Sequence, residues 1–186
     1  MVKAEDGEGL RKLVERLRQG DTEAFEAVFR LYYPRLADYA SGLVRSRDSA
    51  EDVVQEVFVA LWTQRDRLTS PDNLAGYLYR AVRNRSLNQI RHKRMVTDWQ
   101  TRRAAEETPV APPADKESEN AEILAAVNQA VATLSPRCRE VFELSRNRGL
   151  TYPEIAETLG ISIKTVETLM GRALKGVRER LTSFRS

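Results

Sequence analysis

Cysteine and histidine are too scarce in this sequence for the usual disulfide and metal chemistry. Among 186 residues, Cys138 is the single cysteine and His92 the single histidine. One cysteine excludes an internal disulfide and a Cys-rich zinc site, and one histidine excludes paired-histidine metal motifs. We therefore expect an interior held by packing alone, with no metal and no cofactor. Cys138 is expected in the core and His92 at the surface or near DNA.

Long apolar runs are missing as well. No stretch approaches the roughly 20 apolar residues that a membrane-spanning helix needs, and the first residues, MVKAEDGEGL, are too polar for a secretion signal. We expect no membrane insertion and a cytoplasmic protein.

The residues that are abundant favour helices. Leu, Ala, Glu and Arg dominate over the β-branched residues that strands prefer, which predicts an all-α fold. The length allows one large domain or two small ones. Because the net charge is only +3, an argument for nucleic acid must rest on where the positive charge lies.

One stretch, 73–94, combines an apolar stripe with a row of positive charge. The stripe has helical spacing and consists of Leu74, Tyr77, Leu78, Ala81, Val82, Leu87 and Ile90. The cations between them are Arg80, Arg83, Arg85, Arg91, Lys93 and Arg94, accompanied by Asn84, Asn88, Gln89 and Tyr79. Guanidinium groups pair with phosphates, amides read base edges and rings stack on bases. The stretch therefore suits nucleic acid, and the alternative is a solvated basic face.

The chain is expected to open with two helices. Leu10, Leu13, Val14 and Leu17 predict the first, which stops at Gly20, and Asp21 or Thr22 is expected to cap the second. The inner face of the second helix consists of Phe25, Val28, Phe29 and Tyr32. We expect this face in the core, and the alternative is an aromatic box that binds a ligand. Pro34 is expected to break this helix, and 46–49 to form a turn.

The next helix pairs a buried apolar side with an acidic one. Its buried side is predicted to be Ala50, Val53, Val54, Val57, Phe58, Leu61 and Trp62, and its acidic side Asp48, Glu51, Asp52, Gln55 and Glu56. Three interpretations compete. The carboxylates could stabilise a helix N-terminus, hold a metal, for which the histidine partners are missing, or dock on a basic protein surface.

Composition divides the rest of the chain. The segment 68–73, LTSPDN, is expected to be a loop. Residues 99–121 are rich in Ala, Pro and Glu without apolar period, and predict a flexible acidic linker. Its charge either mimics nucleic acid in a positive channel or only keeps the linker extended. The predicted division is a first domain over 1–98, a linker over 99–121 and a second domain over 122–186.

The second domain carries the most specific pattern in the chain. After a helix that Ser135 caps, with Pro136 at its first position, the stretch 151–175, TYPEIAETLGISIKTVETLMGRALK, predicts a short helix, a tight turn at Gly160 and a second helix capped by Ser162. This is a helix-turn-helix pattern. The residues expected to face DNA are Ser162, Lys164, Thr165, Glu167, Thr168, Arg172 and Lys175. A helical hairpin without a DNA role is the alternative.

The order of these parts resembles the extracytoplasmic-function (ECF) group of bacterial RNA polymerase sigma factors. The helix SAEDVVQEVFVALW is similar to the one that grips the polymerase clamp, and Asp52, Gln55 and Glu56 match that motif. The stretch YLYRAVRNRSLNQIRHKR is similar to the segment that recognises and melts the promoter element nearest the start site. SPRCREVFELSRNRGLTYPEIAETLGISIKTVETLMGRAL is similar to the domain that binds the more distant element.

The resemblance implies a function without covalent chemistry. It implies a transcription initiation factor, not an enzyme, with core RNA polymerase, promoter DNA and an anti-sigma factor as partners and with no small-molecule substrate. The residues expected at the proximal element are Ser70, Asp72, Asn73, Tyr77, Arg80, Arg83, Asn84, Asn88, Arg91 and Arg94. Ser70, Asp72 and Asn73 are expected to line a pocket for one flipped base.

The sequence departs from the family in both DNA-binding segments. The family usually has tryptophan at the position of Tyr77 and aspartate at that of Asn88, and many members have Lys-Ser-Arg where this chain has 167–169, Glu-Thr-Leu. Two other functions are open from the residues alone. A non-sigma regulator would use the helix-turn-helix but leave the acidic helix unexplained, and a metal-dependent hydrolase would use the carboxylates around Asp52.

Overall fold

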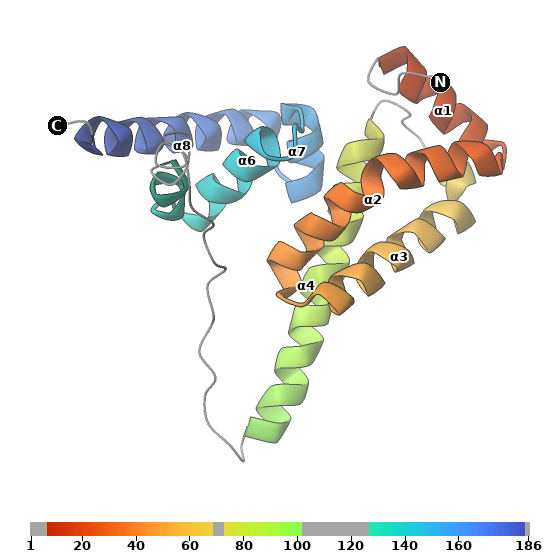
Figure 1. Cartoon of the computed structure of the whole chain (residues 1–186), viewed down its shortest axis with the longest axis horizontal. Coiled ribbons are helices and arrows are strands. Elements are labelled where there is room, and N and C mark those ends of the chain that lie inside the picture. The colour runs from red at the N-terminus through yellow and green to blue at the C-terminus, as the bar shows by residue number, and fades with distance from the viewer. Residues whose placement is uncertain (1–6, 69–72, 102–126, 185–186) are drawn as a thin grey trace, which may run out of the picture. The chain divides into compact units, whose positions relative to one another are not determined.

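The structure is a computed structural model in which residues 7–68, 73–101 and 127–184 are described (Figure 1). In these residues every regular element is a helix, which confirms the all-α prediction. The chain divides into two compact units, one containing α1 to α4 and the other containing α6, α8 and the greater part of α7. Within the described part, no helix is both long enough and apolar enough to cross a membrane.

The first unit is a small helical bundle. Its elements are α1 (Gly7–Arg18), α2 (Thr22–Val44), α3 (Arg47–Thr63), the short 3-10 helix η1 (Arg65–Arg67) and α4 (Leu74–Thr101). Figure 1 shows α2 and α3 side by side, with α4 behind them. Each of the four α-helices contributes fully buried side chains to one core, among them Val14, Leu17, Val28, Leu36, Val54, Leu61, Leu78 and Val82.

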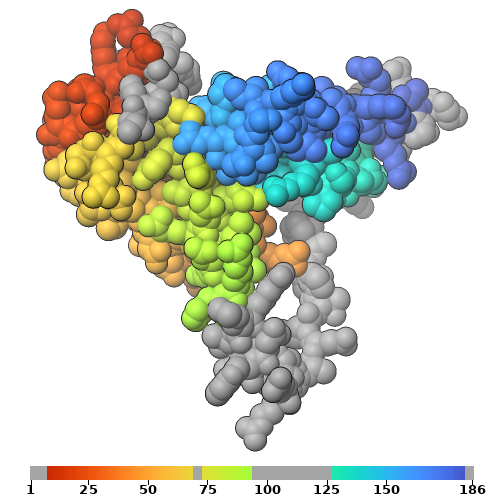
Figure 2. Space-filling model, turned by 180° about the vertical axis from the view of Figure 1, so that it is seen from behind, coloured from red at the N-terminus to blue at the C-terminus, as the bar shows by residue number. Residues whose placement is uncertain are grey.

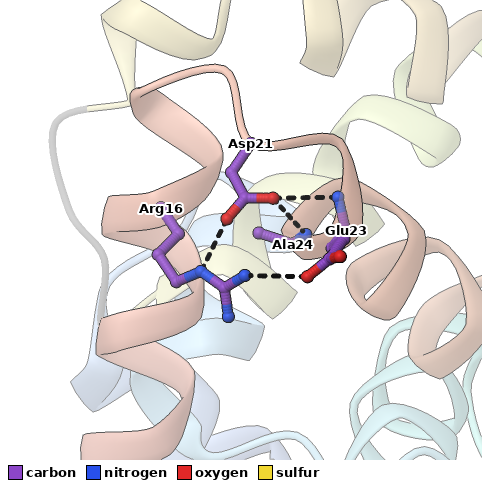
Figure 3. Close-up of polar contacts among 4 residues, drawn as sticks. All are labelled: Arg16, Asp21, Glu23 and Ala24. Carbon is purple, nitrogen blue, oxygen red and sulfur yellow. Dashed lines mark hydrogen bonds and ion pairs between the residues drawn. The ribbon is translucent and has the colours of Figure 1, made fainter.

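The connection from α1 to α2 is closed by a polar cluster (Figure 3). Asp21 is the N-cap of α2, as one of the two predicted candidates, and its Oδ1 accepts from the backbone N–H groups of Glu23 at 2.9 Å and Ala24 at 3.3 Å. Arg16 reaches back from α1, and its Nε donates to Asp21 Oδ2 at 2.6 Å. The Arg16 guanidinium, helped by the cap bonds, lowers the pKa of Asp21 below its ordinary value.

Pro34 does not end a helix, contrary to the sequence prediction. Helix α2 continues from Thr22 to Val44 with Pro34 inside it, and Figure 1 shows α2 as a bent helix. Proline removes one N–H and crowds the carbonyl one turn earlier. Because Pro34 is exposed, that carbonyl can be hydrated, while buried Tyr32 and Leu36 on either side keep both halves packed on the core. The predicted turn at 46–49 is also mostly helical, since α3 starts at Arg47.

The buried face of α4 differs from the predicted stripe. Tyr79, predicted among the cationic groups, is 1% exposed and its ring packs against that of Tyr39, with 5.1 Å between centroids. Val82 and Ser86 continue this buried line, whereas Tyr77 and Ala81 are only partly buried. At 3.6 residues per turn, positions 79, 82 and 86 share one side of a helix. Helix α4 also runs through residues 99–101, which the sequence assigned to the linker.

The second unit is a compact group of helices. A helix at 127–132 is followed by α6 (Pro136–Arg146), α7 (Tyr152–Leu159) and α8 (Ile163–Phe184). Ser135 is at the N-cap position of α6, but its side chain makes no capping hydrogen bond. Arg139 of α6 instead donates to carbonyls at the end of the preceding helix, including that of Val131 at 3.2 Å. Cys138 is buried, as predicted for a core thiol.

Candidate nucleic-acid and protein interfaces

The exposed side of α3 carries the predicted acidic surface. Asp52, Gln55 and Glu56 are all exposed, and buried Val53, Val54, Val57 and Phe58 fix the opposite side of the helix against the core. Their spacing of three and four residues places them within one turn of one another. In the described residues, no group of three or more potential ligands could hold a metal ion. The arrangement suits contact with a basic surface.

An apolar groove of about 550 Å³ adjoins this acidic surface, and sequence reasoning missed it. The groove is lined by Thr22, Phe25, Phe29, Gln55, Phe58, Val59 and Trp62. Val28 and Tyr32 are buried as predicted, but Phe25 and Phe29 are only partly buried. The Phe25 ring packs edge-on against Trp62 with 5.1 Å between centroids. The predicted aromatic core therefore reaches the surface on one side.

Val59 is the clearest residue that the sequence analysis passed over. Its side chain is 64% exposed, although it is large and apolar. Val59 lies four residues after Gln55 and seven after Asp52, so it extends the same exposed line on α3. An apolar residue at a position where the helical period requires a polar one was the signal available in the sequence.

Helix α4 presents a polar strip along one side. Five predicted DNA-binding residues recur at three- and four-residue steps on the side opposite Val82, and none of them is buried: Tyr77, Arg80, Asn84, Asn88 and Arg91. Arg91 donates to Asn88 Oδ1 at 3.3 Å. Figure 2 shows α4 side chains, in yellow and green, forming a continuous strip of surface.

The other predicted residues at the proximal element lie beside or outside this strip. Asn73 immediately precedes α4, and its side chain lies against the backbone of Gly76, where an added Cβ would collide with it. Arg83 lies on the flank and is partly buried. Arg94 belongs to α4 by its backbone. Ser70 and Asp72 lie outside the described residues.

Polar contacts join α3 to α4. Arg85 Nε approaches Glu56 Oε2 at 3.4 Å, and Lys93 Nζ donates to Ser49 Oγ at 2.9 Å. The Arg85–Glu56 pair borders a cleft of about 590 Å³ that Asp52 and Gln89 also line. One residue of the cationic stretch is thus paired with one carboxylate of the acidic surface.

The helix-turn-helix in the second unit has the predicted turn. Thr151 and Glu154 form a reciprocal capping box at the start of α7, with Thr151 N donating to Glu154 Oε2 at 2.7 Å. Gly160 has φ +65°, a left-handed conformation that favours glycine. Ser162 Oγ then accepts from Thr165 N at 3.1 Å and caps α8.

The buried side of α8 determines which of its residues are exposed. Val166, Met170, Ala173 and Val177 are buried, whereas Leu169 is only partly buried. The seven predicted DNA-facing residues are all exposed: Ser162, Lys164, Thr165, Glu167, Thr168, Arg172 and Lys175. Lys175 lies 3.8 Å from Glu179. The first turns of α8 thus carry a mixed polar and cationic face, as a recognition helix does.

Comparison with known proteins matches both units to one family. The model "Sigma-70 region 2" matches residues 28–95, which include α3 and most of α4, and "Sigma-70, region 4" matches residues 124–175, which include the helix-turn-helix. The chain belongs to the ECF group of RNA polymerase sigma factors. This confirms the family and the function that the sequence resemblance implied: the protein is a sigma factor acting in promoter-directed transcription initiation.

Similarity to sigma factors extends over nearly the whole chain. Sigma factor NccH of Alcaligenes xylosoxydans xylosoxydans is 30% identical over 177 residues, covering 92% of each chain. CarQ of Myxococcus xanthus is 29% identical over 168 residues, covering 90% of this chain and 95% of its own. The ECF sigma factor SigK of Mycobacterium sp. (strain KMS) is 24% identical over 179 residues, covering 92% and 88%.

Two solved structures share the fold. CnrH, in complex with the cytosolic domain of CnrY, gives a TM-score of 0.61 at 26% identity and covers 93% of this chain and 97% of its own. The sigma factor RpoE, in complex with the anti-sigma factor NepR from Bartonella quintana, gives a TM-score of 0.61 at 25% identity and covers 85% and 96%.

Proposed function

We propose that Asp52, Gln55 and Glu56 dock this sigma factor on the basic coiled coil of the largest core polymerase subunit, with Val59 and the aromatic groove at the centre of the contact. The exposure of Val59 beside exposed carboxylates carries the proposal. An apolar centre surrounded by charged groups is the usual anatomy of a protein interface, because the centre excludes water and the rim supplies specificity.

The polar strip of α4 is the proposed contact to the proximal promoter element. Tyr77 offers a ring on which an unstacked base can lie, and the amides of Asn84 and Asn88 can hydrogen-bond to base edges. Arg80 and Arg91 would neutralise phosphates of the same strand. Taking a base out of its stack costs a few kcal/mol, and stacking and pocket contacts offset it. The roles of Ser70 and Asp72 in a flipped-base pocket stay predictions.

The first turns of α8 are the proposed reader of the distal element. The N-terminal residues of a recognition helix meet base edges in the major groove, while cations further along meet the backbone. Lys164, Thr165 and Thr168 lie near the N-terminus of α8, where base edges would be met. Arg172 and Lys175 lie further along, where the DNA backbone would be met. Two weak DNA contacts on one chain become strong together once the polymerase fixes their separation.

The proposal also covers the domain division, the location in the cell and an anti-sigma partner, and it assigns the protein no enzymatic reaction. The division into a first domain over 1–98, a linker over 99–121 and a second domain over 122–186 is part of it. The protein forms no covalent intermediate and is not an enzyme, and it acts in the cytoplasm, where core polymerase and the chromosome are. The complex of the similar sigma factor RpoE with an anti-sigma factor supports an anti-sigma partner here as well.

Run-off transcription with core polymerase tests this function. Wild type should produce transcripts starting at discrete sites, and Asp52→Ala combined with Glu56→Ala should abolish them by loss of core binding. Glu8→Ala combined with Glu15→Ala removes the same charge from exposed positions of α1 and should leave transcription intact. Full transcription by the α3 double variant would contradict the proposed docking surface.

A further inference from the structure

Glu167 is an acidic residue on a face that otherwise suits DNA. It lies in the second turn of α8, is exposed, and is flanked along the exposed face by Lys164 and Thr168. Buried Val166 and Met170 fix the rotation of the helix, so Glu167 cannot turn toward the core without exposing them.

The Glu167 carboxylate has no hydrogen-bond or ion-pair partner among the residues that the structure describes, whereas Glu179 on the same helix lies 3.8 Å from Lys175. The residues one turn before and after Glu167 are Ile163 and Gly171, and neither carries charge. Glu167 therefore has no charged partner at a spacing of four, and Lys164, three residues before it, forms no ion pair with it in the described residues.

Gly171 leaves space beside this carboxylate. A Cβ added at Gly171 would have no neighbour within 4 Å. The absence of a side chain at this exposed helical position lets a partner approach the backbone of α8 next to Glu167.

A carboxylate at a DNA face needs a specific donor to be tolerated. It is repelled by phosphates and by the acceptors that guanine presents in the major groove, N7 and O6, and that thymine presents, O4. Adenine offers an amino group, but with the N7 acceptor beside it. Cytosine offers the N4 amino group as its major-groove donor, and Glu accepts from it.

We propose that Glu167 is a specificity-determining residue that accepts a hydrogen bond from the N4 amino group of a cytosine in the distal promoter element. The inference rests on the proposed function, which places α8 in a major groove. Glu167 thereby adds selection against the other three bases at one position, and Lys164, Arg172 and Lys175 supply the attraction to phosphates that offsets its charge.

The test is binding of the complete holoenzyme, full-length chain plus core polymerase, to a promoter library randomised in the distal element. Wild type should prefer cytosine at one position by about fivefold, the lower end of the range for a bidentate base contact, because cytosine offers a single donor. Glu167→Ala should lose the preference at that position alone and keep the others. Glu167→Gln should shift it from cytosine toward adenine, because glutamine pairs with the N6 and N7 groups of adenine.

A matched control distinguishes base recognition by Glu167 from the general effect of removing a negative charge from α8. Glu179→Ala removes the same charge from α8 and should change affinity equally for all library members. The inference is overturned if Glu167→Ala also changes affinity equally for all library members, or if wild type has no cytosine preference that this variant alters. Promoter selection by wild type would still support the sigma function in either case. If wild type selects no promoter at all, the proposed function fails first.

Discussion

The ion pair between Arg85 and Glu56 links the proposed polymerase-docking surface on α3 to the proposed DNA-binding helix α4, and it gives a quantitative prediction for the variant Arg85→Ala. Arg85 Nε and Glu56 Oε2 are 3.4 Å apart, and their side chains are 36% and 69% exposed. Pairs this exposed contribute about 0.2–1 kcal/mol, because water screens them. Arg85→Ala should therefore lower the free energy of unfolding by no more than about 1 kcal/mol.

The same variant should affect the two proposed partners in opposite directions. Glu56 must share or give up Arg85 when a basic polymerase surface approaches, so Arg85→Ala should keep core binding and can strengthen it by up to about fivefold, the equivalent of 1 kcal/mol. Open-complex formation should fall, because a cation near the proximal element is lost. Both effects should shrink at high salt.

Fluorescence anisotropy of a labelled chain titrated with core polymerase measures the first effect, and permanganate reactivity of unpaired thymines measures the second. Arg80→Ala is the control, since it removes the same charge from the exposed strip of α4, where no ion pair with the acidic surface is formed. It should reduce opening without changing core affinity. Core binding by Arg85→Ala that is as weak as that of Glu56→Ala would refute the reasoning, because the pair would then be needed for docking.

Three further predictions concern stability. Arg16 lowers the pKa of Asp21, so the Asp21 carboxylate adds stability above the unfolded pKa of about 3.9, and this is lost as the pH falls through the lower folded pKa; Asp21→Asn should reduce the acid dependence of thermal unfolding. Gly160→Ala should destabilise the second unit by about 1 kcal/mol in urea unfolding, from backbone strain at φ +65° alone, since an added Cβ meets nothing within 4 Å. Leu61→Ala should cost about 2–5 kcal/mol in the same assay, because Leu61 is fully buried.

Each of these has a matched comparison. Glu23→Gln removes the charge of an exposed α2 carboxylate that makes no cap bond, and is the charge-matched comparison for Asp21→Asn. Gly171→Ala, at an exposed position inside α8, should be neutral or stabilising by up to about 1 kcal/mol, as alanine favours helices. Val59→Ala should change stability by less than about 0.5 kcal/mol and weaken core binding instead. Equal losses for a variant and its comparison would contradict the stated cause.

Periodicity and local chemistry were enough to predict where most of the helices lie and several of their ends. The cap at Asp21, the left-handed turn at Gly160 and the cap at Ser162 each follow from one residue's backbone or side-chain preference, and the structure contains all three. The exposure of the DNA-facing residues of α8 followed from the apolar spacing of its inner side. These properties are local, so the sequence by itself determined them.

Packing between distant segments decided what the sequence left open. Pro34 was predicted to break a helix because its local preference says so, but buried residues on both sides keep α2 continuous. Tyr79 could face DNA or the core, and its contact with Tyr39, forty positions earlier, placed it inside. Whether Phe25 is covered depends on which helices lie beside it, and no period in the sequence contains that information. Only the tertiary structure could show the apolar groove beside the acidic surface, because a groove is a gap between helices and not a property of either one.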